Sequence, residues 1–354
     1  MSKISENKKI ISLSTILLVL CLLIAGCSTG AHSSASSSSS SKKGSSNVIQ
    51  AYGELDPQVS GQQIIADKEG FFKQEGLNVK NHLMPGPDQN AALISSGTAQ
   101  VIFGSIYNNI SVAASNVDAK LIAPLANAGN TQSIVARKGL NIKSAKDLEG
   151  LKIGATTGSG VIVAIQSMCK EMGVDFNKIK FVNLQAVDQL TALEKGDVDA
   201  IAVWEPWVGK AVAAGGKVLF TGKKSYLPDK KGNVNWLNFY MTVAVSGDFY
   251  RNHKDEAVKF LKALDKATAF INQHPDEAAA IVAKEIKIPT SDAKRIMAKN
   301  DYSMAWNQNF VDSASVMGNY MKAMKNISKV PALSSYSTPD LLKQVDSKLI
   351  QVNN

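Results

Sequence analysis

A short apolar run over residues 198–203 constrains the fold of this chain more than any other stretch. Five of its six residues are apolar, and turn residues bound it, with 196–197 before it and Pro206 after it. Such a run predicts a buried strand of a parallel β-sheet. The strand delivers Trp204 and Glu205 at its carboxyl end, where ligands bind in open α/β sheets. Pro206 restricts the backbone of Glu205 to an extended conformation, so we expect a site element here.

The rest of the chain supplies more strands of the same kind. Apolar runs that predict strands alternate with amphipathic stretches that predict helices, over residues 47–128 and again over 129–246. This alternation predicts two α/β units, each a parallel sheet with helices on its faces. After a polar loop over 223–233, a strand over 237–245 is expected to return towards the first unit. From about residue 247 the pattern predicts only helices.

The first 26 residues predict an export signal rather than part of the fold. Three lysines precede an apolar segment over residues 10–24, and small residues then lead to Cys27. This pattern resembles a bacterial lipoprotein signal, which implies that Cys27 becomes the lipidated first residue. An ordinary N-terminal membrane anchor is the alternative. Residues 27–46 are mostly serine, and such a tract predicts a flexible tether between the lipid and the folded part.

The cysteines and charges exclude several kinds of protein. Cys169 is the one thiol left after the signal and Cys27, so the fold has no intramolecular disulfide, and a buried structural thiol is expected. The net charge of +9 comes from scattered lysines with few arginines. That distribution favours a solvated surface over nucleic-acid binding.

The sequence carries no pattern typical of catalysis. Its four histidines lack metal-ligand spacing, and it contains neither a Gly-x-Ser-x-Gly elbow nor a Gly-Lys-Ser/Thr phosphate loop. We therefore expect a protein that is not an enzyme and that holds no cofactor and no metal.

Four motifs, in this order, identify a family resemblance. They cover residues 66–79 (ADKEGFFKQEGLNV), 142–154 (IKSAKDLEGLKIG), 193–206 (LEKGDVDA through WEP) and 329–332 (KVPA). Together they resemble the extracytoplasmic solute-binding proteins of ABC importers for taurine, aliphatic sulfonates and nitrate.

The resemblance implies an α/β, two-lobed fold of the type II periplasmic-binding-protein kind, with a hinge of two crossing strands. Lobe 1 would comprise residues 47–128 plus about 247–354, and lobe 2 residues 129–246. The lobes would close around a small solute and deliver it to a membrane permease. The protein would act as a monomer on the outer face of the cell membrane, held there by the lipid on Cys27.

Candidate ligand-binding residues follow from strand ends and helix starts. Backbone N–H groups at helix starts attract anions, and glycines allow a ligand to approach the backbone. A plain N-cap and turn is the alternative at both helix starts, and packing of Tyr52 in the cleft wall is the alternative there. The candidates are Tyr52, Glu54, Asp88, Gly104, Ser105, Thr157, Gly158, Ser159, Trp204 and Glu205.

Glu205 bears on the type of ligand. A carboxylate in a cleft repels a bare anion such as nitrate and attracts an amine. We therefore expect a zwitterion of the taurine type, with its sulfonate at the helix starts and its ammonium at Glu205, unless Glu205 points to solvent. Nitrate, a thiamine-pyrimidine-like solute, or a role as a sensor lipoprotein without transport remain alternatives.

Overall fold

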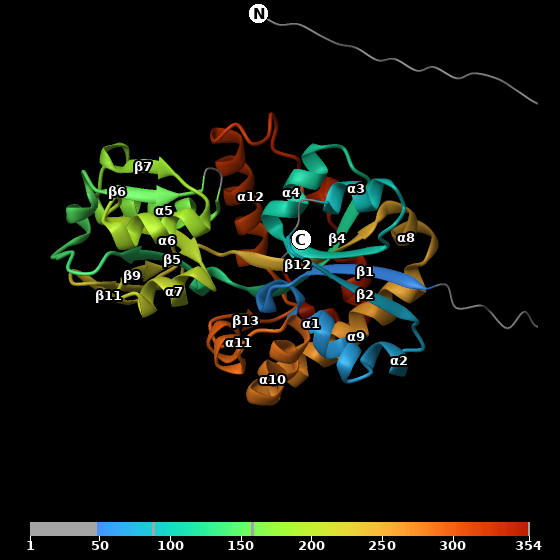
Figure 1. Cartoon of the computed structure of the whole chain (residues 1–354). Coiled ribbons are helices and arrows are strands. Elements are labelled where there is room, and N and C mark those ends of the chain that lie inside the picture. Colours follow the sequence, from blue (N-terminus) through green and yellow to red (C-terminus); the bar gives the residue numbers. More distant parts are fainter. Residues whose placement is uncertain (1–47, 87–88, 157–158, 353–354) are drawn as a thin grey trace, which may run out of the picture. The chain divides into compact units, whose positions relative to one another are not determined.

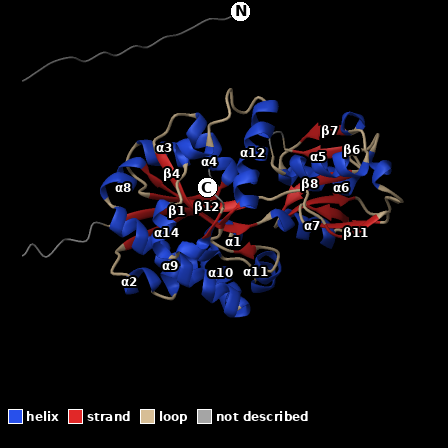
Figure 2. Ribbon diagram, turned by 180° about the vertical axis from the view of Figure 1, so that it is seen from behind, coloured by secondary structure: helices blue, strands red, loops and turns tan. Residues whose placement is uncertain are grey.

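The computed structural model describes residues 48–86, 89–156 and 159–352. Its main strands form two sheets, each accompanied by helices (Figure 1, Figure 2). We call each sheet with its helices a lobe. The signal segment, the tether, Cys27, Asp88, Thr157 and Gly158 lie outside the described residues. Within the described part, no helix has the length and apolar character needed to cross a bilayer.

Among the described residues, the first sheet has six strands in the order β13-β4-β12-β3-β1-β2. Strands β1, β2 and β3 run parallel to one another, whereas β12 lies antiparallel between β3 and β4. The bounds are β1 (Ile49–Glu54), β2 (Val79–Met84), β3 (Val101–Ser105), β4 (Ala119–Asn127), β12 (Tyr240–Ser246) and β13 (Asp301–Tyr302).

The second sheet, in the part of the chain that the structure describes, has seven strands in the order β11-β10-β9-β5-β8-β6-β7. Here β6, β7 and β8 are parallel, and β5 lies antiparallel between β8 and β9. The bounds are β5 (Gln132–Ala136), β6 (Lys152–Ala155), β7 (Lys180–Asn183), β8 (Ala200–Trp204), β9 (Lys217–Thr221), β10 (Lys224–Leu227) and β11 (Lys230–Asn233).

Three helices pack on the second sheet: α5 (Val161–Met172), α6 (Ala186–Lys195) and α7 (Trp207–Ala213). Most of the others pack with the first sheet or with each other, and α1 lies against the long helix α9. They are α1 (Pro57–Lys68), α2 (Phe71–Gln74), α3 (Asn90–Ser95), α4 (Ile106–Ala114), α8 (Gly247–Asn252), α9 (Lys254–Gln273), α10 (Pro275–Ile286), α11 (Thr290–Met297), α12 (Gln308–Ala323), α13 (Leu333–Tyr336) and α14 (Asp340–Val345). A two-stranded sheet joins β14 (Trp306–Asn307) to β15 (Ile350–Gln351).

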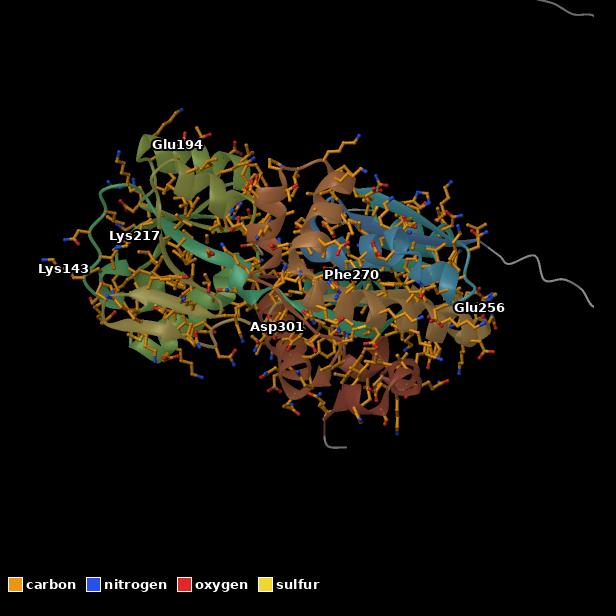
Figure 3. All side chains as sticks on the ribbon, turned by 90° about the horizontal axis from the view of Figure 1, so that it is seen from below. Lys143, Glu194, Lys217, Glu256, Phe270 and Asp301 are labelled. Atoms are coloured by element: carbon orange, nitrogen blue, oxygen red, sulfur yellow. The ribbon has the colours of Figure 1, made fainter. Side chains whose placement is uncertain are left out.

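Several details differ from the sequence predictions. Both sheets are mixed rather than parallel, because β12 and β5 have each crossed from the other lobe and because β13 and the hairpin β10–β11 add further antiparallel pairs. Strand β12 pairs within the first sheet, although the predicted boundary of lobe 2 extended to residue 246. The expected polar loop over 223–233 contains the hairpin β10–β11. Its residues alternate in exposure as strand residues do, but they are too polar for the sequence to show an alternating hydrophobic pattern. Charged side chains of both signs project from both lobes (Figure 3).

Cys169 lies in α5 and is 3% exposed, as a structural thiol would be. Burial raises the pKa of its thiol to about 11, which disfavours the reactive thiolate.

Two segments connect the sheets, residues 128–131 and 234–239, and they run close together. The Ala128 N–H donates to the Phe239 carbonyl at 2.8 Å, and the Gly222 N–H donates to the Gly129 carbonyl at 3.0 Å. A Cβ on Gly129 would lie 2.2 Å from the Leu237 carbonyl oxygen. Glycine at 129 is thus required by the close approach of the two segments.

We expect Gly129→Ala to lower the free energy of unfolding by about 2 kcal/mol or more, because a backbone oxygen must move to admit the methyl group. Urea unfolding followed by circular dichroism measures the change. Gly86→Ala is the matched control, since a Cβ there meets no atom within 4 Å. Equal stability of the two variants would contradict the packing argument.

Candidate functional site

A cavity of about 320 Å³ lies where strand ends of both lobes meet. Residues at or just beyond the ends of β1, β3, β6 and β8 line it, as expected for a ligand site at the carboxyl ends of parallel strands. Its lining comprises Glu54, Asp56, Gln58, Val59, Ser105, Tyr107, Asn108, Gln132, Thr156, Ser159, Gly160, Trp204, Phe239 and Met241.

One side of the cavity is acidic and is held by the first turn of α1. Asp56 is the N-cap of this helix, and its carboxylate accepts from the Gln58 N–H at 2.8 Å. The Glu54 N–H donates to Ser60 Oγ at 2.8 Å, so the end of β1 is tied to the same helix. We call Glu54 and Asp56 the acidic wall. Burial raises the pKa of Asp56 to about 6, because a carboxylate loses hydration there.

The start of α4 is capped by side chains of its N-cap residue and its first turn. Ser105 and Asn108 form a capping box, in which the Ser105 N–H donates to Asn108 Oδ1 at 3.0 Å and Asn108 N–H donates to Ser105 Oγ at 3.3 Å. Ser105 lines the cavity, but its hydroxyl is already used as an N-cap.

The start of α5 differs, because no side chain caps it. Ser159 and Gly160 line the cavity at this helix start, and Ser159 Oγ is buried without a protein hydrogen-bond partner. Helix N-terminal N–H groups and an unpaired hydroxyl can together donate to an anion.

The structure brings four of the predicted site residues to the cavity: Glu54, Ser105, Ser159 and Trp204. It does not bring Tyr52 or Gly104 into the lining. The Tyr52 ring stacks on His82, with 4.3 Å between ring centroids, and the Gly104 carbonyl accepts from Thr242 Oγ1. Asp88, Thr157, Gly158 and the lipidation residue Cys27 fall outside the described residues.

Sequence reasoning missed much of the lining, Asp56 and Gln58 included. One local signal was present for Asp56: an Asp-Pro pair after a predicted strand is typical of an N-cap followed by Pro at the first helical position. Gln132 and Phe239 belong to the crossing segments and their strands, and only the tertiary structure brings them to the cavity.

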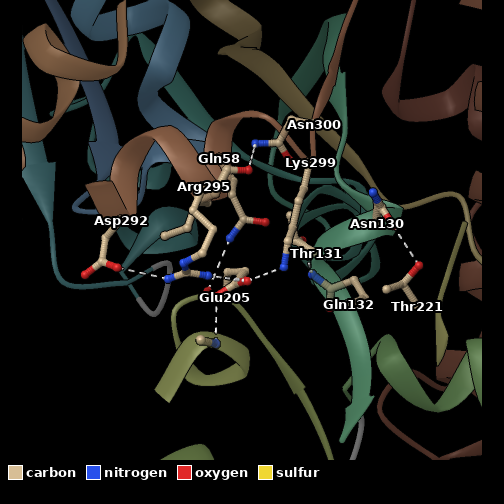
Figure 4. A network of polar contacts seen from close by, with 12 residues as sticks. Gln58, Asn130, Thr131, Gln132, Glu205, Thr221, Asp292, Arg295, Lys299 and Asn300 are labelled. Carbon is tan, nitrogen blue, oxygen red and sulfur yellow. Dashed lines mark hydrogen bonds and ion pairs between the residues drawn. The ribbon is translucent and has the colours of Figure 1, made fainter. Parts of the chain in front are cut away.

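Glu205 differs most from its prediction. Its side chain is 0% exposed and is absent from the cavity lining. The carboxylate pairs with the Arg295 guanidinium and the Lys299 ammonium, each at 2.5 Å (Figure 4). The expectation that Glu205 accepts a ligand ammonium is therefore corrected, because two protein cations already hold this carboxylate.

These three side chains form what we call the interlobe clasp. Glu205 follows β8 of the second lobe, whereas Arg295 lies on α11 and Lys299 just before β13 of the first sheet. The second carboxylate oxygen accepts from the Gly209 N–H at 3.1 Å, which caps α7. A Cβ on Gly209 would lie 2.4 Å from Arg295 Nη2, so glycine here lets the guanidinium approach.

No group of three or more His, Cys, Asp or Glu side chains suitable for a metal ion occurs among the described residues. The cavity lining combines carboxylates, a helix start and aromatic rings, which suits non-covalent capture of a small molecule.

A two-lobed α/β fold with a solute-sized cavity at its strand ends is typical of the class of solute-binding proteins. Residues 58–278 match the family NMT1/THI5 like, and the chain belongs to that family.

Two curated relatives are named as binding proteins, not as enzymes. The chain is 27% identical over 224 residues to a protein of Bacillus subtilis (strain 168) provisionally named as aliphatic sulfonates-binding, over 61% of this chain and 64% of that protein, slightly under two thirds of its length. It is 26% identical over 298 residues to the taurine-binding periplasmic protein of Escherichia coli (strain K12), over 79% of this chain and 86% of that one.

A solved structure agrees in fold. The periplasmic aliphatic sulphonate binding protein SsuA from Escherichia coli superposes with a TM-score of 0.68 at 15% identity, covering 82% of this chain and 91% of that one. The predicted fold class, two-lobed and of the type II periplasmic-binding-protein kind, is confirmed.

The clasp generates one prediction. Glu205→Gln keeps the size of the side chain but leaves two cations without their carboxylate, so we expect a loss of about 1–3 kcal/mol in the free energy of unfolding. Lys299→Met should cost less, because Arg295 still pairs with Glu205. Urea unfolding measures both. Glu256→Gln, which removes an exposed pair with His253, is the control and should stay within about 0.5 kcal/mol. A Glu205 variant as stable as this control would contradict the clasp.

The raised pKa of Asp56 generates a second prediction. A raised carboxyl pKa means that the folded state prefers the protonated form, so this contribution to stability is full below about pH 4 and is lost as pH rises through about 6. Asp56→Asn keeps the N-cap acceptor and removes the charge. The variant and the natural chain should have nearly equal free energies of unfolding at pH 4, and the variant should be about 1–3 kcal/mol more stable at pH 8. Urea titrations at both pH values measure this, and a pH-independent difference would refute it.

Proposed function

We propose that this protein is the solute-binding component of an ABC importer, and that it captures a small sulfonate or taurine-like solute between its lobes. The observation that carries the proposal is the cavity at the strand ends of both lobes. Its volume of about 320 Å³ is at the small end of ligand pockets, which run from roughly 300 to 1,000 Å³. Family membership and the names of the relatives support the transport role.

The sulfonate end of the solute would bind at the start of α5. A sulfonate has three acceptor oxygens and needs donors. At this helix start the Ile162 and Val163 N–H groups already donate to the Ser159 and Gly160 carbonyls, so the main donor is the Ser159 Oγ–H, which has no hydrogen-bond partner among the described residues. The helix dipole adds a favourable field for a negative group at the same place.

The other candidate ligands have weaker support. Nitrate lacks a cationic group that could offset the acidic wall, whereas a taurine-like solute carries an ammonium. A thiamine-pyrimidine-like solute has no sulfonate for the α5 start. A sensor lipoprotein would use the same cavity without a permease, and only a transport measurement separates that role from import.

The cellular setting rests on the sequence. We propose that Cys27 carries a lipid at the outer face of the cell membrane, that residues 27–46 act as the tether, and that the folded part is a monomer that docks on a permease. The signal pattern and the serine tract support the anchor. Stimulation of a reconstituted permease and ATPase by the loaded protein is the direct test of import.

The binding site itself is tested with Ser159→Ala. We expect taurine to raise the unfolding midpoint of the natural chain and to bind about tenfold more weakly to this variant, since a hydrogen bond to a charged group contributes roughly 1.5–3 kcal/mol. Isothermal titration calorimetry gives the affinities. Ser133→Ala is the matched control, because Ser133 Oγ is also buried without a partner but is not in the cavity lining. Equal affinities for both variants would reject the α5 start as the sulfonate site.

A further inference from the structure

The interlobe clasp holds a buried charge at the boundary between the lobes (Figure 4). The Glu205 side chain is 0% exposed, whereas those of Arg295 and Lys299 are 35% and 28% exposed. Water thus reaches the two cations but not the carboxylate. A carboxylate without hydration is stable in such a place while cations stay beside it, so separation of the clasp requires the carboxylate to become hydrated.

Gln58 connects the same residue to the ligand site from the first lobe. It is 1% exposed, it lines the cavity, and its Nε2 donates to the Glu205 carbonyl at 3.3 Å. Gln58 lies in the first turn of α1, whereas Glu205 follows β8 of the second sheet. The first lobe therefore contacts Glu205 in two places, through α1 at the carbonyl and through the two cations at the carboxylate.

Trp204 connects Glu205 to the ligand site from the second lobe. It lines the cavity at the end of β8 and is joined to Glu205 by a peptide bond. A rigid-body movement that takes Trp204 away from Gln58 must therefore also stretch the contacts of Glu205. The clasp is complete only when the cavity walls of the two lobes face each other as they do here.

The two cations act at a distance from the solute. Neither Arg295 nor Lys299 lines the cavity. A solute that touches both lobes binds with an apparent affinity that scales with the fraction of molecules whose lobes are together. Contacts between the lobes that do not involve the solute raise that fraction.

We propose that Arg295 and Lys299 are positioning residues of the ligand site, which raise the affinity for a solute that neither of them touches. By neutralising Glu205 they hold the end of β8 against α1, so that Trp204 and Gln58 face each other across the cavity. The effect on affinity rests on the proposed function, whereas the effect on the lobes does not.

Lys299→Met tests the proposal, because it removes one cation, keeps the aliphatic stem and leaves Arg295 to pair with Glu205. Calorimetry on the full chain should show taurine binding about five- to tenfold more weakly to this variant, and stopped-flow measurements should place the change in the dissociation rate. Arg295→Met should weaken taurine as well, and Arg295→Lys, which keeps the charge, should restore part of the affinity.

Lys294→Met is the matched control. Lys294 lies on α11 next to Arg295, but it pairs with the exposed Asp276 within the first lobe, so its loss should leave taurine affinity unchanged. Circular dichroism shows that each variant is folded. If Lys299→Met and Arg295→Met bind taurine as tightly as Lys294→Met does, the clasp has a structural role alone and the proposal is overturned.

A measurement without ligand separates this inference from the proposed function. Small-angle X-ray scattering should give a larger radius of gyration for Lys299→Met and Glu205→Gln than for the natural chain, with Lys294→Met unchanged. Larger radii in both clasp variants, together with no binding of taurine to the natural chain, would reject the sulfonate function and keep the role of the clasp. Equal radii for all four proteins would overturn the proposal whether or not taurine binds.

Discussion

The buried carboxylate of Glu205 is the interaction on which the arrangement of the lobes depends. A carboxylate with no solvent exposure is stable only when cations and donors surround it. Arg295 and Lys299 come from the first lobe and the Gly209 N–H from the second, so burying this one charge fixes α11 against the end of β8. The Glu205 carbonyl also accepts from Gln58, which extends the same contact to the cavity lining. The clasp and the cavity are thus adjacent, but the charged side chains of the clasp do not line the cavity.

The first turn of α1 contributes both a helix cap and part of the cavity lining. Asp56 caps the helix, and its carboxylate faces a cavity where hydration is poor, which raises its pKa. The side chain of Asp56 therefore stabilises the helix as an N-cap, whereas its ionised form destabilises the folded state because it is poorly hydrated. A cationic ligand would offset that destabilisation, because a nearby positive charge favours the ionised carboxylate.

The strand ends were largely predictable, and the pairings between lobes were not. Glu54, Ser105, Ser159 and Trp204 lie next to strands with clear apolar patterns, and the end of a parallel strand is a known place for a ligand. Glu205 has the same local pattern as Trp204, yet the two side chains lie in different surroundings. No local pattern shows that a lysine and an arginine about 90 residues later lie beside Glu205.

The sequence by itself determined the two α/β units, the place of most strands and the buried state of Cys169, because hydrophobic periodicity and glycine or proline punctuation act locally. It also predicted two helix starts whose residues Ser105 and Ser159 line the cavity. The tertiary structure decided that the Glu205 carboxylate is buried between two protein cations, whereas Glu54 and Asp56 line the cavity. That choice depends on distances between segments far apart in the chain, since a charge is stabilised by what surrounds it in space and not by its neighbours in sequence.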